Sequence, residues 1–184
     1  MTSTAPRVKF IKKLRALNCV QRWNYHPRCR FENVAEHSYW VAVFAHQFAQ
    51  IMKIDDIALA QFMSVALYHD RLEAITGDLP QPVKRGRDWT DVEEAAEQEL
   101  GHIYSGDFVL EGNQRIIKAA DLMAAYVFAE EEVKMGNSNF IRIKNEIITA
   151  LYKVAPKEIH EFLIGWGIHA QMGVPPLDEM SHLG

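Results

Sequence analysis

Residues 58–70 read ALAQFMSVALYHD, an apolar stretch that ends in the dipeptide His69-Asp70. The stretch predicts a helix, and near the end of a helix two adjacent side chains can reach one cation. Imidazole nitrogen and carboxylate oxygen suit Zn, Co, Mn or Fe better than Ca. Alone the dipeptide is a weak indication of a metal site, because such pairs also occur as ordinary solvated helix ends.

The length and charge of the chain restrict the classes of protein that it can belong to. Its 184 residues suffice for one domain, with an expected core over residues 7–171 and an irregular tail over 172–184. The net charge of −4 provides no basic field, which argues against nucleic acid as a partner. An anionic small substrate would need a local cationic pocket.

Cysteine usage and hydropathy indicate the compartment. Cys19 and Cys29 lack a CxxC spacing, and we expect two reduced thiols rather than a disulfide or a zinc site. No run of residues approaches the length of a membrane span, and residues 1–6 carry no apolar leader. We therefore expect a cytoplasmic protein without a membrane partner.

Hydrophobic periodicity predicts an all-α domain, a bundle of about seven helices, with no repeats and no strands. The predicted helices cover residues 7–17, 33–52, 56–70, 90–104, 113–135, 138–153 and 156–170. Residues 76–82 (TGDLPQP) combine glycine, aspartate and two prolines, which predicts a loop.

Local patterns predict the helix starts and the buried faces. Asn33 followed by Glu36, and Thr90 followed by Glu93, have the form of capping boxes. Either of the aspartates at 55 and 56 can cap the helix that ends in His69-Asp70. In the first helix, Val8, Ile11 and Leu14 recur at helical spacing, and we expect them to form its buried stripe.

A metal site at His69-Asp70 needs about two further ligands. His37 lies at the beginning of one predicted helix, and Asp121 lies in the most apolar part of another. Burying an unpaired carboxylate there costs roughly several kcal/mol. Asp121 should therefore meet a cation. The set His37, His69, Asp70 and Asp121 converges if three helices pack as a bundle, although His37 can also be a simple polar residue and Asp121 a partner of Lys118 or Arg115.

The remaining histidines lack such neighbours, and we interpret them as surface or core residues. They are His26, His46, His102, His160, His169 and His182.

The ligand set resembles that of the HD-domain metal-dependent phosphohydrolases, an all-α superfamily. Four further motifs are similar to the bacterial 5′-deoxynucleotidase (YfbR-like) family over residues 10–153. They are Arg22-Trp23, residues 32–38 (ENVAEHS), residues 68–70 (YHD) followed by Glu73, and residues 76–80 (TGDLP) with 82–84 (PVK). The resemblance implies a divalent cation (Co, Mn or Zn, with Mg as a second ion) and a homo-oligomer, either a dimer or a larger assembly such as a hexamer.

The segment between Asp70 and Asp121 is shorter than in a typical cellular nucleotidase, and in this it resembles the phage dATP triphosphohydrolases (DatZ-type). The resemblance implies hydrolysis of dATP to deoxyadenosine and triphosphate, with dADP and dAMP as further substrates. The alternative is a 5′-deoxynucleotidase that converts dNMPs to deoxynucleoside and phosphate. Both activities cleave the same 5′-phosphate ester.

Two carboxylates are candidates for proton transfer. Glu73 lies one turn after Asp70, so it can point into the same cavity without binding the metal, and it matches the family pattern. Its alternative role is that of an exposed carboxylate at a helix end. Asp78 follows Gly77 and can handle a second proton or ligate a second metal, but it can equally be an ordinary turn residue.

Five residues are candidates for binding the nucleotide. Arg22 offers a bidentate fork for phosphate, and Lys84 and Lys118 offer point charges, Lys118 also being a candidate surface partner of an acidic residue. Trp23 resembles the family tryptophan that packs on the sugar and excludes a 2′-hydroxyl, and its alternative role is core filling. Tyr25 can reach the base edge.

Two other classes of protein also remain open as interpretations of the sequence. The chain can be a helical module that binds nucleotide without turnover, or an HD protein acting on a cyclic dinucleotide or a guanosine alarmone. Those substrates carry a 2′-hydroxyl or a 2′,3′-phosphate, which an indole wall at Trp23 should resist. Activity on ribonucleotides would favour the second of these readings.

Overall fold

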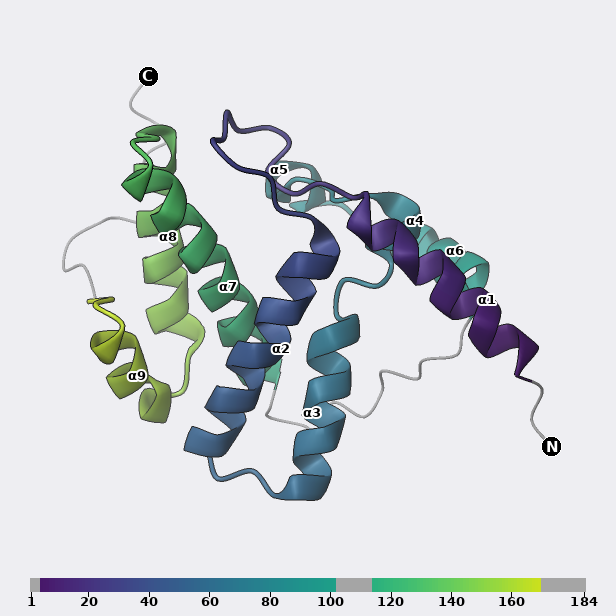
Figure 1. Ribbon diagram of the computed structural model, residues 1–184, viewed down its shortest axis with the longest axis horizontal. Helices are drawn as coiled ribbons and strands as arrows, with labels where there is room; N and C mark the ends of the chain where they lie inside the picture. The colour runs from purple at the N-terminus through teal and green to yellow at the C-terminus, as the bar shows by residue number, and fades with distance from the viewer. Residues whose placement is uncertain (1–3, 102–113, 170–184) are drawn as a thin grey trace.

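The computed structural model describes residues 4–101 and 114–169 of the chain, and this part is all-helical, as predicted (Figure 1). No strand occurs in these residues, and an isolated antiparallel bridge joins Gln21 to Asn33. Seven of the α-helices have six or more residues, as expected, and α4 and α5 are single turns. The elements are α1 Ala5–Leu14, η1 Arg15–Asn18, α2 Val34–Ile51, α3 Asp56–Tyr68, α4 Glu73–Thr76, α5 Gln81–Lys84, α6 Thr90–Leu100, α7 Gln114–Lys134, α8 Asn139–Val154, η2 Lys157–Ile159 and α9 His160–Gly165.

The bundle is built on α2, which packs against α3 on one side and α7 on the other, while α8 packs on the far side of α7 (Figure 1). The largest side chains of the core are phenylalanines from these helices, among them Phe48, Phe128 and Phe140, none of which is accessible to solvent. Alanines fill much of the α2–α7 contact, which lets the two backbones approach closely. This packing sets the distance between the ligand candidates on α2 and α7.

The start of α2 is fixed as predicted. The side chain of Asn33 accepts a hydrogen bond from the backbone N–H of Glu36 (2.9 Å), and the side chain of Asp55 caps α3 in the same way. His37 therefore lies in the first turn of α2, and His69 follows the last residue of α3.

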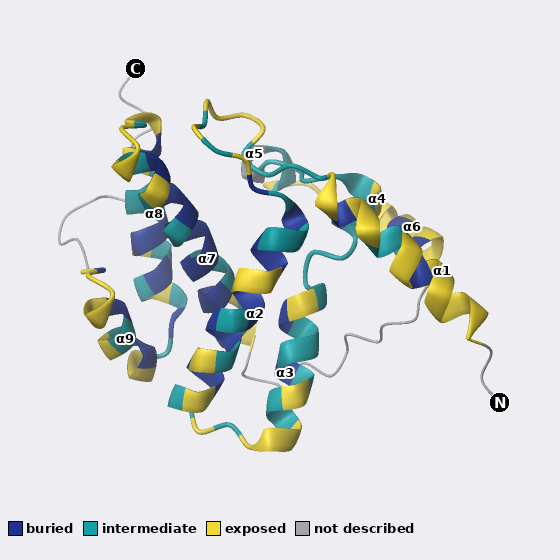
Figure 2. Cartoon of the chain, viewed as in Figure 1, coloured by how far each residue is buried: buried dark blue, intermediate teal, exposed yellow. Residues whose placement is uncertain are grey.

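The predicted buried stripe of the first helix is wrong at Val8 and Ile11, whereas Leu14 is partly buried and Leu17, next in the same spacing, is buried in η1. Val8 and Ile11 are about half exposed, and α1 instead buries Phe10, whose ring lies 6.0 Å from that of Tyr68. Figure 2 shows α1 as a largely exposed helix at one edge, beside α4 and α6. A helix at the edge needs only a narrow contact, so one aromatic residue replaces the stripe that a bundle helix would require.

The ends of two other helices also differ from prediction. The side chain of Asp88, not that of Thr90, caps α6, because it accepts from both the N–H and the hydroxyl of Thr90. This helix ends at Leu100, and the predicted end at 104 lies outside the described residues, as does the tail 172–184. The helix predicted over 156–170 is a 3₁₀ turn followed by α9, which Gly167 ends in a left-handed conformation (φ +85°).

Two further expectations concern the chain as a whole. Cys19 and Cys29 are free and exposed. Among the helices that the structure describes, none has the length and apolarity required to cross a bilayer.

Candidate functional site

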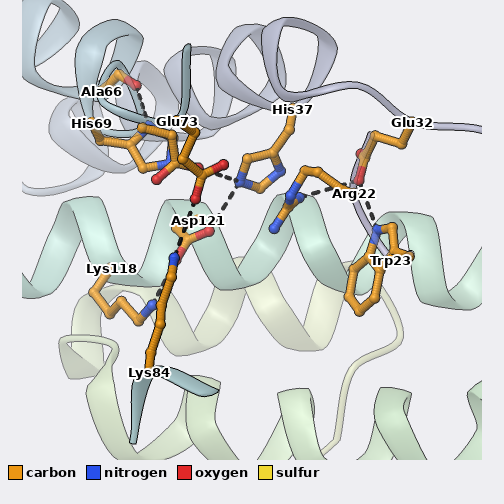
Figure 3. A network of polar contacts seen from close by, with 11 residues as sticks. Arg22, Trp23, Glu32, His37, Ala66, His69, Glu73, Lys84, Lys118 and Asp121 are labelled. Carbon is orange, nitrogen blue, oxygen red and sulfur yellow. Dashed lines mark hydrogen bonds and ion pairs between the residues drawn. The ribbon is translucent and has the colours of Figure 1, made fainter. Parts of the chain in front are cut away.

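Four predicted ligand candidates meet where α2, α7 and the turn after α3 come together (Figure 3). The Nε2 atom of His37 lies 3.0 Å from Oδ1 of Asp121 and 3.9 Å from Oδ2 of Asp70. The same Asp70 oxygen lies 3.0 Å from Nε2 of His69. Within this group, one donor atom from each of His37, His69 and Asp70 lies within 4.8 Å of the others.

The donor geometry fits a divalent cation. Atoms bound to one ion at about 2.1 Å lie roughly 3.0–3.5 Å apart, which is close to the spacings in this cluster. The Nδ1 atom of His69 lies 2.8 Å from the carbonyl oxygen of Ala66, and this contact orients the ring so that Nε2 faces the carboxylates. Two imidazoles with two carboxylates form a donor set suited to Zn, Co or Mn.

The electrostatics of the cluster favour a positive charge at its centre. Burial, together with the Arg22 guanidinium, lowers the pKa of His37 to about 4, so this ring is neutral, which is the form that binds metals. Burial opposes ionisation of Asp121, but the hydrogen bond from His37 and the charge of Lys118 hold its pKa well below the usual range. Burial also disfavours charge on His69, yet the hydrogen bond with Asp70 raises its pKa. The carboxylates thus draw a proton onto His69 at the place where a cation would be held.

Asp121 has two partners rather than one. Its Oδ1 atom faces His37, while Oδ2 accepts from the ammonium group of Lys118 at 2.6 Å. Arg115, the other partner considered, instead donates to the carbonyl oxygen of Val154. Oδ2 thus has the lysine partner expected of an ion-paired carboxylate, and Oδ1 faces the other ligand candidates.

Glu73 points into the same region from the start of α4. It is only 7% exposed, which does not fit an exposed carboxylate at a helix end, and its backbone N–H donates to the carbonyl of Asp70. Its Oε1 atom accepts from Lys84 at 3.2 Å, and Oε2 is buried without a hydrogen-bond partner. Burial, and then the charges of Asp70 and Asp78, raise the pKa of Glu73 to about 7. Such a carboxyl can exchange a proton near neutral pH.

Asp78 lies in the loop between α4 and α5. Burial raises its pKa, while the charges of Arg22 and Lys84 and a hydrogen bond from the backbone of Trp23 act in the opposite direction. Asp78 is thus close to two of the cationic candidates, Arg22 and Lys84, which is not expected of an ordinary turn aspartate.

Arg22 and Trp23 form a rigid platform beside His37. The indole of Trp23 stacks on Phe128, with centroids 5.3 Å apart and an interplanar angle of 7°, and the guanidinium of Arg22 lies 5.4 Å from the indole centroid. The backbone of Trp23 is left-handed (φ 62°), which is rare for a bulky residue and persists only where surrounding contacts hold it. Tyr25, by contrast, is 72% exposed and makes no hydrogen bond or ring contact with a described residue, so the structure does not bring it to the cluster.

Two buried glutamates were not predicted to matter. Glu32 (2% exposed) accepts from Arg22 and from Trp23, and Glu132 (fully buried) accepts from the backbone N–H groups of Cys29 and Arg30. The sequence indicated Glu32 only as the first residue of the family motif over residues 32–38. Glu132 ends a run of three glutamates that looks like a solvated helix face, and nothing in the sequence distinguishes it.

Comparisons with known proteins identify the family of the chain. Residues 9–165 match the family model described as 5′-deoxynucleotidase YfbR-like. A 5′-deoxynucleotidase of Vibrio vulnificus is 33% identical over 192 residues, covering 94% of this chain and 97% of the relative. One of Klebsiella pneumoniae is 31% identical, covering 94% of this chain and 95% of the relative.

A solved structure shares the fold. It is the HD phosphohydrolase DatZ of cyanophage S-2L, bound to dA and one catalytic Zn²⁺ ion, with a TM-score of 0.66, 19% identity, and coverage of 90% of this chain and 94% of that one. The match over most of the chain, together with the relatives above 30% identity, establishes the family. The chain belongs to the 5′-deoxynucleotidase YfbR-like family.

Proposed function

We propose that this protein hydrolyses the 5′-phosphate ester of 2′-deoxynucleotides, with dATP as the principal substrate and deoxyadenosine and triphosphate as the products. The observation that carries the proposal is the convergence of His37, His69, Asp70 and Asp121 beside the buried carboxyl of Glu73. A non-catalytic binding module would have no need for a proton donor with a pKa near neutrality next to a metal-type donor set.

The four ligand candidates would hold one divalent cation, with Zn, Co or Mn as the preferred ions and Mg as a candidate second ion. When bound, such an ion supplies a water of lowered pKa and polarises a phosphoryl oxygen. The acidic pair of Asp70 and Asp121 is ionised in the structure, so the protein contributes two ready anionic ligands.

Glu73 is the proposed proton-transfer residue. Attack of water on the α-phosphorus breaks the bond between phosphorus and O5′, and the leaving alkoxide needs a proton. A carboxyl group with a pKa of about 7 is substantially protonated at neutral pH and can give that proton to O5′. Asp78, which shares the cation of Lys84 with Glu73 and also faces Arg22, is the second candidate for handling protons.

The cationic residues are proposed to bind the phosphates. Arg22 lies on one side of His37 in Figure 3, and Lys84 and Lys118 lie on the other. The side chains of Lys84 and Lys118 are 38% and 53% exposed, so their ammonium groups are accessible from solvent. Three cationic groups exceed what one phosphate needs, which favours a triphosphate, and the stacked Trp23 is proposed to exclude a 2′-hydroxyl.

The second candidate function is that of a 5′-deoxynucleotidase acting on dNMPs. It is favoured by the names of the full-length relatives at 31% and 33% identity. The two candidates differ in how many phosphates lie beyond the α-phosphorus, and not in the bond that is cleaved.

A product analysis tests both candidates. The purified protein is incubated with dATP, dAMP, the other dNTPs and dNMPs, and the matching ribonucleotides, with Co, Mn, Zn or Mg, and phosphate, pyrophosphate and triphosphate are separated. We expect dATP to yield intact triphosphate, ATP to be spared, and Asp70→Ala and Glu73→Ala to abolish turnover. Phosphate from dNMPs alone would select the second candidate, and pyrophosphate would overturn the proposed bond cleavage.

We also propose that the protein is a homo-oligomer, a dimer or a larger assembly. In the single chain, Tyr39, Trp40 and Leu67 expose between 45% and 59% of their surface. Tyr39 and Leu67 line an apolar groove of about 370 Å³ between α2 and α3. Light scattering after size-exclusion chromatography measures the mass, and a monomer of 21.1 kDa at micromolar concentration would contradict the proposal.

A further inference from the structure

Glu32 lies where the two nucleotide-binding candidates meet (Figure 3). Its side chain is buried, and a single oxygen, Oε2, accepts from Nη1 of Arg22 at 3.1 Å and from Nε1 of Trp23 at 2.9 Å. Hydrogen bonds to an ionised acceptor are stronger than neutral ones. The position of one oxygen thus determines the positions of both a guanidinium and an indole.

The backbone around Glu32 strengthens this link. The N–H of Arg22 donates to the carbonyl of Glu32 at 2.9 Å, and the N–H of Val34 donates to the carbonyl of Val20 at 3.0 Å. Together with the bridge between Gln21 and Asn33, these bonds pair residues 20–22 with residues 32–34. Because α2 begins at residue 34, the pairing also fixes Arg22 and Trp23 relative to His37.

The contacts with Glu32 occupy only part of the Arg22 and Trp23 side chains. A guanidinium has five N–H donors, and the hydrogen bond with Glu32 uses Nη1, so donors remain for an anion. The indole of Trp23 is held at its N–H edge by Glu32 and on one face by Phe128. Glu32 therefore restrains both groups without covering them.

We propose that Glu32 is a positioning residue that couples phosphate binding by Arg22 to selection of deoxyribose by Trp23. This inference rests on the proposed function. A loss of the Glu32 carboxylate releases two side chains together, so it weakens the hold on phosphate and loosens the wall against a 2′-hydroxyl. A residue that only stabilises the fold would leave both properties intact in the folded fraction.

The test compares Glu32→Gln and Glu32→Asp with wild type and with a control, Glu146→Gln. Glu146 is also an arginine-paired glutamate, bonded to Arg142 at 2.7 Å, but it lies on the exposed surface of α8. Two quantities are measured with metal-loaded protein: the ratio of kcat/KM for dATP over ATP, and the inhibition constant of inorganic tripolyphosphate. If monophosphates are the substrates, the ratio is that of dAMP over AMP and the inhibitor is inorganic phosphate.

We expect both Glu32 variants to lower the deoxy-to-ribo ratio by about tenfold and to weaken inhibition by the inorganic anion by about tenfold, while Glu146→Gln changes neither. Two comparison variants separate the halves of the site. Arg22→Lys should weaken anion inhibition and leave the ratio near the wild-type value, and Trp23→Phe should lower the ratio and leave inhibition unchanged.

Each outcome has a distinct meaning. If both Glu32 variants keep the wild-type deoxy-to-ribo ratio and the wild-type inhibition constant, the coupling is overturned and the proposed function still stands. The same holds if only one of these two quantities changes. A wild-type protein inactive on every nucleotide tested would overturn the proposed function and the coupling with it. If Glu32→Gln does not fold, Glu32→Asp, which keeps the charge but shortens the side chain, carries the test.

Discussion

The Nε2 atom of His37 and the Oδ1 atom of Asp121 lie 3.0 Å apart, although 84 residues separate them in the chain. The contact joins the first turn of α2 to the middle of α7. The ligand cluster is therefore assembled only when these two helices pack together, and a cation bound there would stabilise that packing.

We expect metal to raise the melting temperature of chelator-treated protein. A ligand at 100 times its Kd adds about 2.7 kcal/mol to the free energy of unfolding. The Asp121→Ala variant should need at least about 100-fold more metal to reach the same rise in melting temperature. Thermal unfolding with added Zn, Co or Mn measures this. Asp56→Ala, which removes an exposed carboxylate of α3, is the matched control, and an equal shift in Asp121→Ala would contradict the ligand assignment.

Glu73 should make the stability of the metal-free protein depend on pH. Its pKa in the fold is about 7, against an ordinary value of 4.5, so the folded state keeps a proton that the unfolded chain has released. The stabilisation is complete below about pH 4.5 and is lost as pH rises through about 7. Glu73→Gln stays neutral, so relative to wild type it should gain up to about 3 kcal/mol between about pH 5 and pH 8.

Urea denaturation with EDTA at the two pH values measures the difference between Glu73→Gln and wild type. Comparing the two proteins cancels the contribution of His69, whose pKa is also raised. A difference that stays constant with pH would show that Glu73 titrates normally.

Removing the exposed lysine Lys118 should weaken binding of a nucleoside triphosphate more than binding of a monophosphate. Lys118→Ala is expected to raise KM for dATP by about tenfold and KM for dAMP by less, because its ammonium group has further phosphates to contact only in the triphosphate. Steady-state kinetics on both substrates measures this, with Lys53→Ala, in the exposed turn after α2, as control. Equal effects on both substrates would argue against a triphosphate site.

Glu132 should be among the most important side chains for stability. It accepts from the N–H groups of Cys29 (2.7 Å) and Arg30 (2.9 Å) and from the amide of Asn137 (2.6 Å). Glu132→Gln places an N–H₂ group against these donors, and each donor left unpaired costs about 1–3 kcal/mol.

We therefore expect Glu132→Gln to lose roughly 2–4 kcal/mol of unfolding free energy in urea. The neighbouring Glu131, which is half exposed and paired with Arg30, is the control, and Glu131→Gln should change stability by less than about 1 kcal/mol. Similar values for the two variants would show that burial of Glu132 contributes little.

The sequence predicted those parts of the molecule that depend on local chemistry. Asn33 caps α2 by a hydrogen bond three residues along, and the apolar stretch before His69 forms α3, so both ligand positions followed from neighbours in the chain. Asp121 was found from a different argument, the cost of burying a carboxylate among alanines, and its two oxygens do have partners, His37 and Lys118.

What the sequence did not predict depends on contacts between distant residues. The stripe of Val8 and Ile11 has the spacing of a buried face, but α1 lies at the edge of the bundle, where Phe10 is the residue that becomes buried. Glu132 gains its role because residues 29 and 30 fold back onto α7, more than 100 positions away. Periodicity reports which residues can be buried, and packing decides which of them are.

The pairing of residues 20–22 with residues 32–34 has a consequence for how this protein can change over evolution. The hairpin-like loop that carries Arg22 and Trp23 closes on a segment only about ten positions away, whereas the candidate metal ligands come from α2, α7 and the turn after α3, between residues 37 and 121. We therefore expect that mutations confined to this short loop can change which nucleotides the proposed enzyme accepts while the candidate metal ligands stay in place.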